Sequence, residues 1–595
     1  MRNFGALLLI FGLAGLAGNF YIQNQVPELK ASIFDLVEEA QNAGMDVNKW
    51  DEVAAMAKDE IPPFPGLFRI RNSFGEVPKI LHAIESLQSE FLNTETFPEI
   101  IPMDQIDRSF GHLRNIKESL GKIEEAMDVI PNWIVTEDIR EQKLEGEAKL
   151  AIARESLESV LELESVISRW AEQEERLIII LQNPNEPRST GGFMGSLLVL
   201  DFSKESISWK FQDIYAIDRL IPAEKLLLTP DWFQGLSRTL SLRDANFWPD
   251  FSTSAEEIRA MFALAGEQSP GTVIAITPEW VKVWLELIGG TRMSKWGVDF
   301  TPENFDLVLQ FLVESKIEGR WGAKNPVMKL AEQMIAPYAV ARITPEKIAA
   351  IDWEALIAEK HIQAHSRDKK MQKTFEQWGI TGTLQRQEDA DNFLAFDFIS
   401  IGANKSEKFV WTRLEHNSLI AADGEVVNTL KITRTHSLHS GEISQQLGEK
   451  KWSQNVRELL TPDILWKLGA GENRTMLRVW VPFDSELVYG VSPSGNVRAV
   501  PRTEGDFTML EIPVNVLPGE SVIAAVQYKT HIARGSQNWR PYNLQIVGTP
   551  ARKQTKLIST VSTLDSGKFT AETENVGAPI PLLDGSVRAV VEWQK

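Results

Sequence analysis

The segment Gly271-Thr-Val-Ile-Ala-Ile-Thr-Pro-Glu-Trp-Val-Lys-Val-Trp-Leu-Glu-Leu-Ile-Gly-Gly290 carries the local signals of a strand followed directly by a helix. Its first part, residues 272–276, is short and apolar, which is typical of a buried strand. Thr277 can cap the helix that follows, Pro278 fits the first helical turn, and the closing glycine pair ends the helix. The segment therefore predicts a strand-to-helix unit of the kind that builds α/β domains.

The chain around this unit repeats the same alternation. Leu177-Ile-Ile-Ile-Leu181 is a short apolar run, and residues 194–201 and 207–211 have the patterns of two further strands. Thr253-Ser-Ala-Glu256 has the spacing of a capping box and predicts the start of another helix. We therefore expect a layered α/β domain over residues 176–392.

Three other regions differ from this domain in texture. Residues 26–175 are rich in Glu, Lys, Ala and Leu, with an apolar seam at steps of three and four, so we expect a bundle of antiparallel helices. That seam consists of Ile106, Phe110, Leu113, Ile116, Leu120, Ile123, Met127 and Ile130. Residues 393–550 show closely spaced strand patterns without helices, which predicts a β-sandwich, and residues 551–595 are expected to form a β-rich tail. The whole chain is thus predicted to be a multidomain α+β protein.

Residues 1–25 carry the signal for the compartment. Residues 5–22 contain no charge and are just long enough to cross the ~30 Å hydrocarbon core of a bilayer. Arg2 favours a cytoplasmic N-terminus, so a single membrane anchor would place the bulk of the chain outside the cytoplasm. The alternative is a cleaved signal peptide, with Gly15-Leu16-Ala17 as its small-residue site. Both interpretations predict export, and we expect a single-pass protein of the cell membrane.

Composition excludes some classes of function. The 595 residues include 82 acidic and 62 basic ones, so the formal charge is −20 and non-specific nucleic-acid binding, which needs a basic face, is not expected. The absence of cysteine excludes disulfides and thiolate metal sites. His361 and His365 are four residues apart, as on one helix face, but the HExxH glutamate is missing, so a solvated pair is favoured over a zinc site.

Three separated loops at the edge of the α/β domain supply polar residues that can converge on one ligand. These loops are residues 183–193, 213–219 and 243–250. Arg188 and Arg243 are the informative cations, because a guanidinium can hold two oxygens of a phosphate or carboxylate at once. These arginines are therefore candidates for holding an anionic ligand, and the prediction that they act with Asp213 and Asp244 as catalytic residues rests on the second resemblance described below.

The same loops contain the candidate ligand-binding and metal-binding residues. The ligand-binding candidates are Gly191, Gly192, Arg219, Asn246 and Trp248. Glycine lets the backbone approach a ligand closely, and tryptophan can stack on a sugar ring or line a lipid groove, although packing is its commoner role. Asp213 and Asp218 are the candidate metal ligands, because Mg²⁺ shares its oxygen shell among carboxylates, waters and substrate phosphates. Loops are rich in such residues for turn chemistry alone, so a purely structural role stays open.

Three motifs resemble the signature segments of the bacterial domain of unknown function 4012 family. They are Gln182-Asn-Pro-Asn-Glu-Pro-Arg188-Ser-Thr-Gly-Gly-Phe-Met-Gly-Ser196, Arg243-Asp-Ala-Asn-Phe-Trp-Pro-Asp-Phe-Ser-Thr-Ser254 and Gly402-Ala-Asn-Lys-Ser406. The resemblance covers about residues 177–550. It implies an N-terminal membrane segment and a helical region before the matching part, while the activity of the family is not established. Lys405, within the third motif, can either reach the site or brace the sandwich, and bracing is favoured.

Residues 271–290 are also similar to the strand, helix and glycine pair of LytR-CpsA-Psr proteins. Those proteins are membrane-anchored phosphotransferases that move polymers from a polyprenyl-pyrophosphate carrier to the cell wall. The resemblance implies that Arg188 grips the pyrophosphate and that Arg243 offsets charge on the leaving phosphate. It also implies that Asp213 or Asp218 holds Mg²⁺.

Two departures from that pattern leave the reaction open. The Arg-Asp dipeptide expected at the end of the third strand appears as Gln212-Asp213, and Arg-x-Asp-Thr is replaced by Arg188-Ser-Thr-Gly-Gly. The sequence therefore predicts an extracytoplasmic envelope protein that binds, and can transfer, a polyprenyl-pyrophosphate-linked glycopolymer, with Mg²⁺ as its cofactor. Its partners would be the lipid-linked glycan or cell-wall polymer and the membrane. The alternative is a non-enzymatic cell-surface scaffold or adhesion protein.

Overall fold

The computed structural model describes residues 99–128 and 163–592 apart from short gaps, together with a few single positions before residue 162. The gaps lie at residues 320–321, 337–338, 340–341, 344–346, 349, 454–455, 503–506, 533–538, 552–553, 564–567, 575–578 and 582–584. The predicted anchor at residues 1–25 lies outside the described residues. Within the described part, no helix combines the length and the apolar character needed to cross a bilayer.

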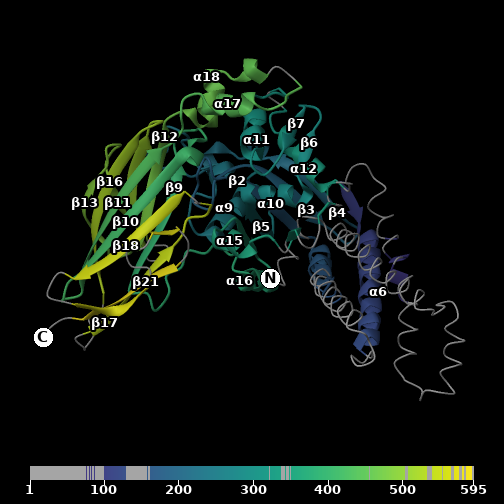
Figure 1. Ribbon diagram of the computed structural model, residues 1–595, viewed down its shortest axis with the longest axis horizontal. Helices are drawn as coiled ribbons and strands as arrows, with labels where there is room; N and C mark the ends of the chain where they lie inside the picture. The colour runs from purple at the N-terminus through teal and green to yellow at the C-terminus, as the bar shows by residue number, and fades with distance from the viewer. Residues whose placement is uncertain are drawn as a thin grey trace, which may run out of the picture.

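The helical region packs beside the α/β part of the molecule, on the side away from the β-sandwich (Figure 1). Its long helix α6 (Met103–Asp128) buries the predicted seam from Ile106 to Ile123. The helical residues 163–172 contribute Leu163, Ile167 and Trp170 to the same core. The seam prediction is confirmed where the structure describes it, because apolar residues at this spacing share one face of a helix.

The central sheet has six strands in the order β1-β4-β3-β2-β5-β8. They are β1 (Ile100–Pro102), β2 (Arg176–Asn183), β3 (Phe193–Phe202), β4 (Ser206–Asp213), β5 (Thr272–Ile276) and β8 (Ile362–Ser366). Strands β2 and β5 are parallel neighbours, and every other pair in this sheet is antiparallel. The carboxyl ends of β2 and β5 therefore meet at one edge, which is where open α/β sheets bind ligands.

Helices cover both faces of this sheet, as a layered domain requires. Helix α9 (Phe251–Leu264) packs with Ile178 and Ile180 on one face. The opposite face, which carries Leu177 and Ile179, packs against three helices. These are α10 (Pro278–Ile288), α11 (Phe305–Glu314) and α12 (Asn325–Ile335). Alternate residues of one strand thus belong to two cores, and the mixed α/β character is confirmed.

Local signals placed both ends of one helix correctly, although Thr277 makes no side-chain capping hydrogen bond there, and they gave the wrong cap in another helix. Helix α10 begins at Pro278 and ends at Gly289, which adopts a left-handed φ of 67° as a helix stop requires. The capping box predicted at Thr253 is wrong, because Asp250 caps α9 by accepting from the Thr253 backbone N–H at 2.8 Å. The aspartate lies one turn earlier and offers a charged acceptor to the same free N–H group.

The C-terminal part is a sandwich of two sheets, ordered β13-β16-β11-β10-β18-β20 and β14-β15-β12-β9-β17-β21-β19 (Figure 1). The strands are β9 (Asn392–Ser400), β10 (Val410–Ile420), β11 (Glu425–His436), β12 (Asn473–Pro482), β13 (Glu486–Val491), β14 (Arg498–Arg502), β15 (Phe507–Val516), β16 (Ser521–His531), β17 (Trp539–Val547), β18 (Thr555–Thr563), β19 (Lys568–Glu574), β20 (Pro579–Pro581) and β21 (Gly585–Glu592). The apolar residues between the two sheets form one buried core.

The tail predicted for residues 551–595 is not a separate unit where the structure describes it. Strand β18 pairs in parallel with β10, and β21 pairs with β17, so the tail supplies strands to both sheets of the sandwich. The sandwich therefore extends past the predicted boundary at residue 550. Its strands were foreseen, but the pairing of distant strands is not readable from local pattern.

The remaining elements are short. They are α8 (Ile214–Asp218), β6 (Thr291–Met293), β7 (Val298–Phe300), α15 (Trp353–Ala358), α16 (Lys369–Gln377), α17 (Glu442–Gly448) and α18 (Pro462–Leu465). Strand β8 contains His365, and His361 immediately precedes it. The prediction that these two histidines share a solvated helix face is wrong, and His361 is buried.

Candidate functional site

A cleft of about 500 Å³ opens at the sheet edge where β2 and β5 end. Strand β2 contributes Gln182 and Asn183, and the start of α10 contributes Thr277 and Pro278. Helices α11 and α12 form another wall, and Lys405 enters from the loop between β9 and β10 of the sandwich. The cleft is therefore built by both parts of the molecule at the switch point of the sheet.

Arg188, the first predicted ligand grip, lines the back of this cleft but is buried, with 1% of its surface exposed. Its Nε and Nη2 atoms both lie 2.9 Å from Asp244 Oδ1, and its Nη1 donates to the backbone carbonyl of Ser400 at 3.2 Å. The guanidinium also lies between the rings of Phe193 and Phe233. Arg188 and Asp244 thus neutralise each other, and the pair anchors the α/β domain to the sandwich.

Arg243 is the more accessible of the two predicted arginines, with 27% of its side chain exposed at the cleft. Its Nη1 lies 3.1 Å from Asp218 Oδ2, and its guanidinium stacks over the Tyr215 ring at 4.8 Å. Burial raises the pKa of Asp218, while Arg243 and the Leu242 backbone N–H oppose that shift. Its Nε also lies 3.8 Å from Asp244 Oδ2, so two carboxylates share the charge of Arg243 at the cleft.

The predicted glycine pair serves the loop rather than a ligand. Gly191 and Gly192 adopt φ of 130° and 149°, conformations that side chains disfavour. A Cβ on Gly192 would collide with the backbone of Asn183, and Asn246 Nδ2 donates to the Gly192 carbonyl at 2.8 Å. Neither the two glycines nor Asn246 lines the cleft. The inference that another group comes close to the glycine backbone was correct, but that group belongs to the protein chain and not to a ligand.

Trp248 and Arg219 also lie away from the cleft. Trp248 packs edge-to-face on Phe247 at 5.2 Å and faces the Arg478 guanidinium at 5.7 Å. Arg478 pairs with Asp397 in the sandwich and donates to the Phe247 carbonyl, so this cluster joins the two domains. Arg219 is exposed on the surface. Trp248 thus makes packing contacts and does not line the cleft.

The two predicted metal ligands are engaged with the protein itself. Asp213 caps α8 by accepting from the Tyr215 backbone N–H at 3.2 Å. Asp218 accepts from the Leu242 backbone N–H at 2.7 Å and faces Arg243. In the described part of the chain, no group of three or more histidines or carboxylates is placed to hold a metal ion. These carboxylates do not form a prepared Mg²⁺ shell, and we derive no step through a metal.

Lys324, which the sequence did not single out, brings a further basic side chain to the cleft. Its ammonium has no ion-pair or hydrogen-bond partner among the described residues, and it lies against Gly195, where an added methyl group would be 2.9 Å from Nζ. Burial lowers the pKa of Lys324, the charge of Lys405 lowers it further, and Asp213 and Glu314 oppose the shift. The residue precedes an ordinary amphipathic helix, so no local pattern marked it.

Lys405 reaches the cleft, contrary to the favoured interpretation that it braces the sandwich. Its Nζ lies 2.6 Å from Glu314 Oε1 of α11 and 3.8 Å from Glu186 Oε2. Burial acts to raise the pKa of Glu314, but the charge and hydrogen bond of Lys405 outweigh it, and the pKa is lowered. Lys405 therefore has direct ion-pair partners. Lys324 has none among the described residues and interacts with Asp213, Glu314 and Glu186 only at longer range.

An apolar pocket of about 180 Å³ continues from the cleft between the sheet and α10 and α12. Five residues line both spaces: Leu181, Ile276, Val281, Leu309 and Val327. The apolar pocket also exposes the rings of Trp209, Phe211, Trp280 and Trp284. A cationic cleft joined to a hydrocarbon-lined pocket suits a ligand with an anionic head and an apolar tail.

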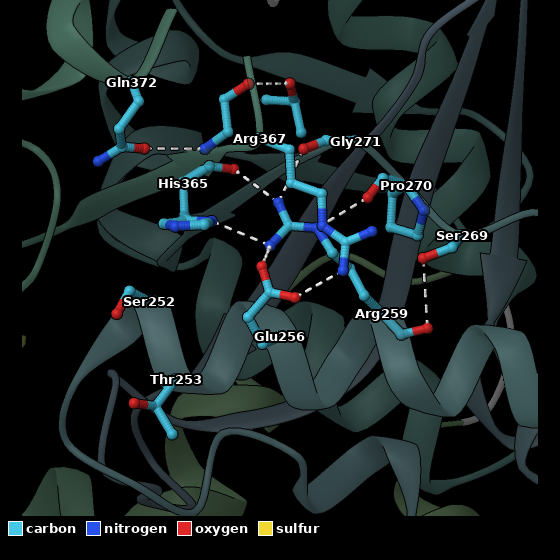
Figure 2. Close-up of polar contacts among 12 residues, drawn as sticks. Ser252, Thr253, Glu256, Arg259, Ser269, Pro270, Gly271, His365, Arg367 and Gln372 are labelled. Atoms are coloured by element: carbon cyan, nitrogen blue, oxygen red, sulfur yellow. Dashed lines mark hydrogen bonds and ion pairs between the residues drawn. The ribbon is translucent and has the colours of Figure 1, made fainter. Parts of the chain in front are cut away.

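A second polar cluster lies on the α9 face of the sheet (Figure 2). Arg259 of α9 is buried and donates to the carbonyls of Pro270 and Gly271 at 2.8 Å each, and it pairs with Glu256 at 2.7 Å. Its Nη1 also lies 2.9 Å from His365 Nδ1. Burial lowers the pKa of His365, and the charge of Arg259 lowers it further. This cluster ties α9 to the ends of β5 and β8.

Comparisons with known proteins find a family match for part of the chain. No curated protein matches it. Among solved structures, a crystal structure of a Parabacteroides distasonis ATCC 8503 protein, provisionally described as a protease, is similar at 10% identity and a TM-score of 0.17. That similarity covers 31% of this chain and 41% of the other, so it spans less than half of the solved protein and carries no argument about fold or activity. Residues 172–311, which hold the first two signature motifs and the sheet edge of the cleft, match the family model described as "Protein of unknown function (DUF4012)", and this match supports the DUF4012 family.

Proposed function

We propose that the cleft binds an amphiphile with a diphosphate head and a hydrocarbon tail, of the polyprenyl-diphosphate-linked glycopolymer class. The observation that carries the proposal is Lys324, a basic side chain that lines the cleft and has no direct ion-pair partner among the described residues. A partly buried charge without a partner is costly, so an anion placed beside it stabilises the folded protein and gains affinity in return. Arg243, which pairs with Asp218 and Asp244, brings a second basic side chain to the lining of the cleft.

The apolar pocket explains why the proposed ligand is a lipid rather than a free diphosphate. Val327 lies in the first turn of α12, three residues after the N-cap residue Lys324, and lines both the cleft and the pocket. A headgroup at Lys324 would therefore place the first part of its tail among the tryptophan rings. The predicted membrane anchor at residues 1–25 and a LytR-CpsA-Psr-like role at the extracytoplasmic face are parts of this proposal.

Isothermal titration of the full chain in detergent with a polyprenyl diphosphate tests the headgroup site. Lys324→Ala is expected to weaken binding by about 10- to 100-fold, the effect of losing one charge-assisted hydrogen bond. Lys329→Ala is the matched control, because Lys329 lies on the same helix, faces Glu318 at 4.0 Å and does not line the cleft. The titrations are run with and without Mg²⁺. Equal affinity of the wild type and Lys324→Ala for the lipid would overturn the proposal.

A second arm separates the tail from the head. Ala331 lines the apolar pocket but not the cleft, so Ala331→Phe fills the pocket without touching a cation. This variant is expected to lose affinity for the lipid while keeping the wild-type response to inorganic diphosphate. If Ala331→Phe binds the lipid normally, the tail lies elsewhere and only the anion site survives.

One observation favours a scaffold as the second candidate function. Strand β13 lies at the edge of its sheet and exposes Val488, Tyr489 and Val491. An exposed edge strand can pair with another chain. The scaffold role predicts that Val488→Lys with Val491→Lys, and not Lys324→Ala, removes retention on isolated cell-wall material; retention of the double variant would contradict it.

A further inference from the structure

Three side chains form a hydrogen-bonded chain that ends in the cleft. Thr277 Oγ1 lies 2.8 Å from His361 Nδ1, and His361 Nε2 lies 2.8 Å from Glu359 Oε2. Thr277 lines the cleft at the carboxyl end of β5, although only 2% of its surface is exposed. His361 is equally buried behind it. The order hydroxyl, imidazole, carboxylate is the arrangement that activates a nucleophile.

The partners of His361 fix its tautomer. An ionised carboxylate can only accept, so Glu359 requires a proton on His361 Nε2. In the neutral ring Nδ1 then carries a lone pair and accepts the Thr277 hydroxyl proton. The ring is thus held with its basic nitrogen on the threonine oxygen.

Thr277 does not use its side chain to cap helix α10. Thr277 is the N-cap residue of α10, but its side chain makes no capping hydrogen bond. N-cap threonines usually accept from the second or third helical N–H group. Here the hydroxyl is committed to His361, and the positive end of the helix dipole stays available at the cleft.

We infer that Thr277 is a nucleophile that takes the sugar phosphate from the bound lipid, with His361 as its general base; the inference rests on the proposed function. The Thr277 Oγ–P bond forms as the P–O bond to the polyprenyl phosphate breaks, and that phosphate leaves with the electron pair. The hydroxyl proton moves to His361 Nδ1. A hydroxyl of a wall polymer, or water, then attacks phosphorus and releases its proton to solvent, while the threonine oxygen regains its proton from His361.

The remaining groups of the cleft have matching roles. Glu359 is a positioning residue, because it holds the tautomer of His361 without touching the ligand. Lys324 and Arg243 line the same cleft as Thr277 and offset charge on the phosphate groups. The chain of contacts therefore joins an anion site to a hydroxyl group that has a base of its own.

Mass spectrometry of the quenched reaction tests this inference. The full chain is incubated with a polyprenyl-diphosphate-linked sugar, quenched and digested, and the peptide containing residue 277 is examined for a sugar-phosphate adduct. The wild type and Thr277→Ser are expected to carry the adduct, and Thr277→Val is expected to lack it. His361→Gln should slow adduct formation by about 10²- to 10⁴-fold, Glu359→Gln should slow it less without changing Kd, and His365→Gln is the matched control from the adjoining strand β8.

The outcomes separate this inference from the proposed function. A wild-type protein that fails to bind the lipid overturns both. A wild-type protein that binds the lipid in the calorimeter but forms no adduct overturns only the nucleophile. Release of polyprenyl phosphate by folded Thr277→Val at the wild-type rate also overturns it, whereas an adduct at residue 277 that requires His361 supports it.

Discussion

Two histidines at one edge strand have opposite electrostatic settings. His365 lies in β8 and His361 immediately precedes that strand, so a spacing of four residues directs both toward the same side of the sheet. His361 Nδ1 faces a hydroxyl and its Nε2 faces a carboxylate, whereas His365 Nδ1 faces the Arg259 guanidinium. The first ring has a hydroxyl on one nitrogen and a carboxylate on the other, whereas burial and then the charge of Arg259 lower the pKa of His365, which Figure 2 shows beside Arg259. The partner of each ring, and not its spacing in the sequence, decides its chemistry.

The comparison also separates function from support. The network at His365 ends in backbone carbonyls and in a glutamate on α9. Its bonds therefore hold helix α9 against the central sheet. The chain at His361 ends in the cleft at Thr277. Loss of the first network should therefore appear as lost stability, and loss of the second as lost activity.

The largest expected effect comes from disrupting the Arg259 network around His365. Arg259→Met removes a buried guanidinium, leaves Glu256 and three carbonyl groups without it, and is expected to destabilise the protein by about 3–5 kcal/mol. Urea denaturation followed by circular dichroism measures the change. Arg367→Ala is the control, because Arg367 is largely exposed and its pair with Glu256 should contribute less than about 1 kcal/mol. Equal losses in the two variants would contradict the role assigned to Arg259.

His416 sharpens the comparison as a histidine with no charged partner. It is buried in the sandwich, with Nδ1 3.0 Å from Ser559 Oγ, and burial lowers its pKa from 6.5 to about 4. The unfolded chain therefore binds a proton that the folded chain refuses between these values, so stability is lost as the pH falls through this window. The loss reaches about 3 kcal/mol near pH 4.

The check on His416 is a pair of urea titrations at pH 7 and near pH 4. His416→Gln removes the titrating ring. The free energy of unfolding of the sandwich should therefore fall by about 3 kcal/mol less between pH 7 and pH 4 in this variant than in the wild type. Control titrations of His361→Gln and His365→Gln leave His416 in place and should keep that part of the dependence. An unchanged slope in His416→Gln would show that other groups set the acid sensitivity.

A smaller effect tests the functional side. Thr277→Val removes one hydrogen bond to His361 and keeps the shape of the side chain, so we expect a loss of only about 1–2 kcal/mol in unfolding free energy. Urea denaturation followed by circular dichroism measures this loss as well. A loss as large as that of Arg259→Met would mean that the His361 chain is structural and that the two histidines do not differ in purpose.

The smallest effect concerns the position of the Lys324 side chain. Gly195→Ala places a methyl group 2.9 Å from Lys324 Nζ, and a flexible lysine end can move away from it. We expect affinity for a polyprenyl diphosphate to fall by less than about tenfold, with unchanged stability, because the charge is displaced but kept. A loss larger than that of Lys324→Ala would contradict this reading of Gly195.

Local sequence signals predicted the elements better than the contacts between them. The strand at residues 272–276, the start of α10 at Pro278 and its glycine stop all agree with the sequence. The histidine pair was misassigned because a spacing of four places two residues on one face in a strand as well as in a helix. The tail after residue 550 was separated from the sandwich because strand pairing is a long-range property.

The site was only partly readable for the same reason. Arg188 and Arg243 were both predicted to hold a ligand, yet one is sealed against Asp244 and the other reaches the cleft. Sequence shows that an arginine is present, but not whether a carboxylate from another loop reaches it first. Lys324 carries no local motif at all. Thr277 could have been flagged, since it follows a strand whose carboxyl end meets that of its parallel neighbour.

A structure of the full chain bound to a polyprenyl diphosphate tests the central claim most directly. The account predicts a phosphate within hydrogen-bond distance of Lys324 Nζ, with the hydrocarbon chain passing Val327 into the pocket lined by Trp280 and Trp284. A lipid bound elsewhere, with the cleft unchanged and Lys324 still without a partner, would contradict it.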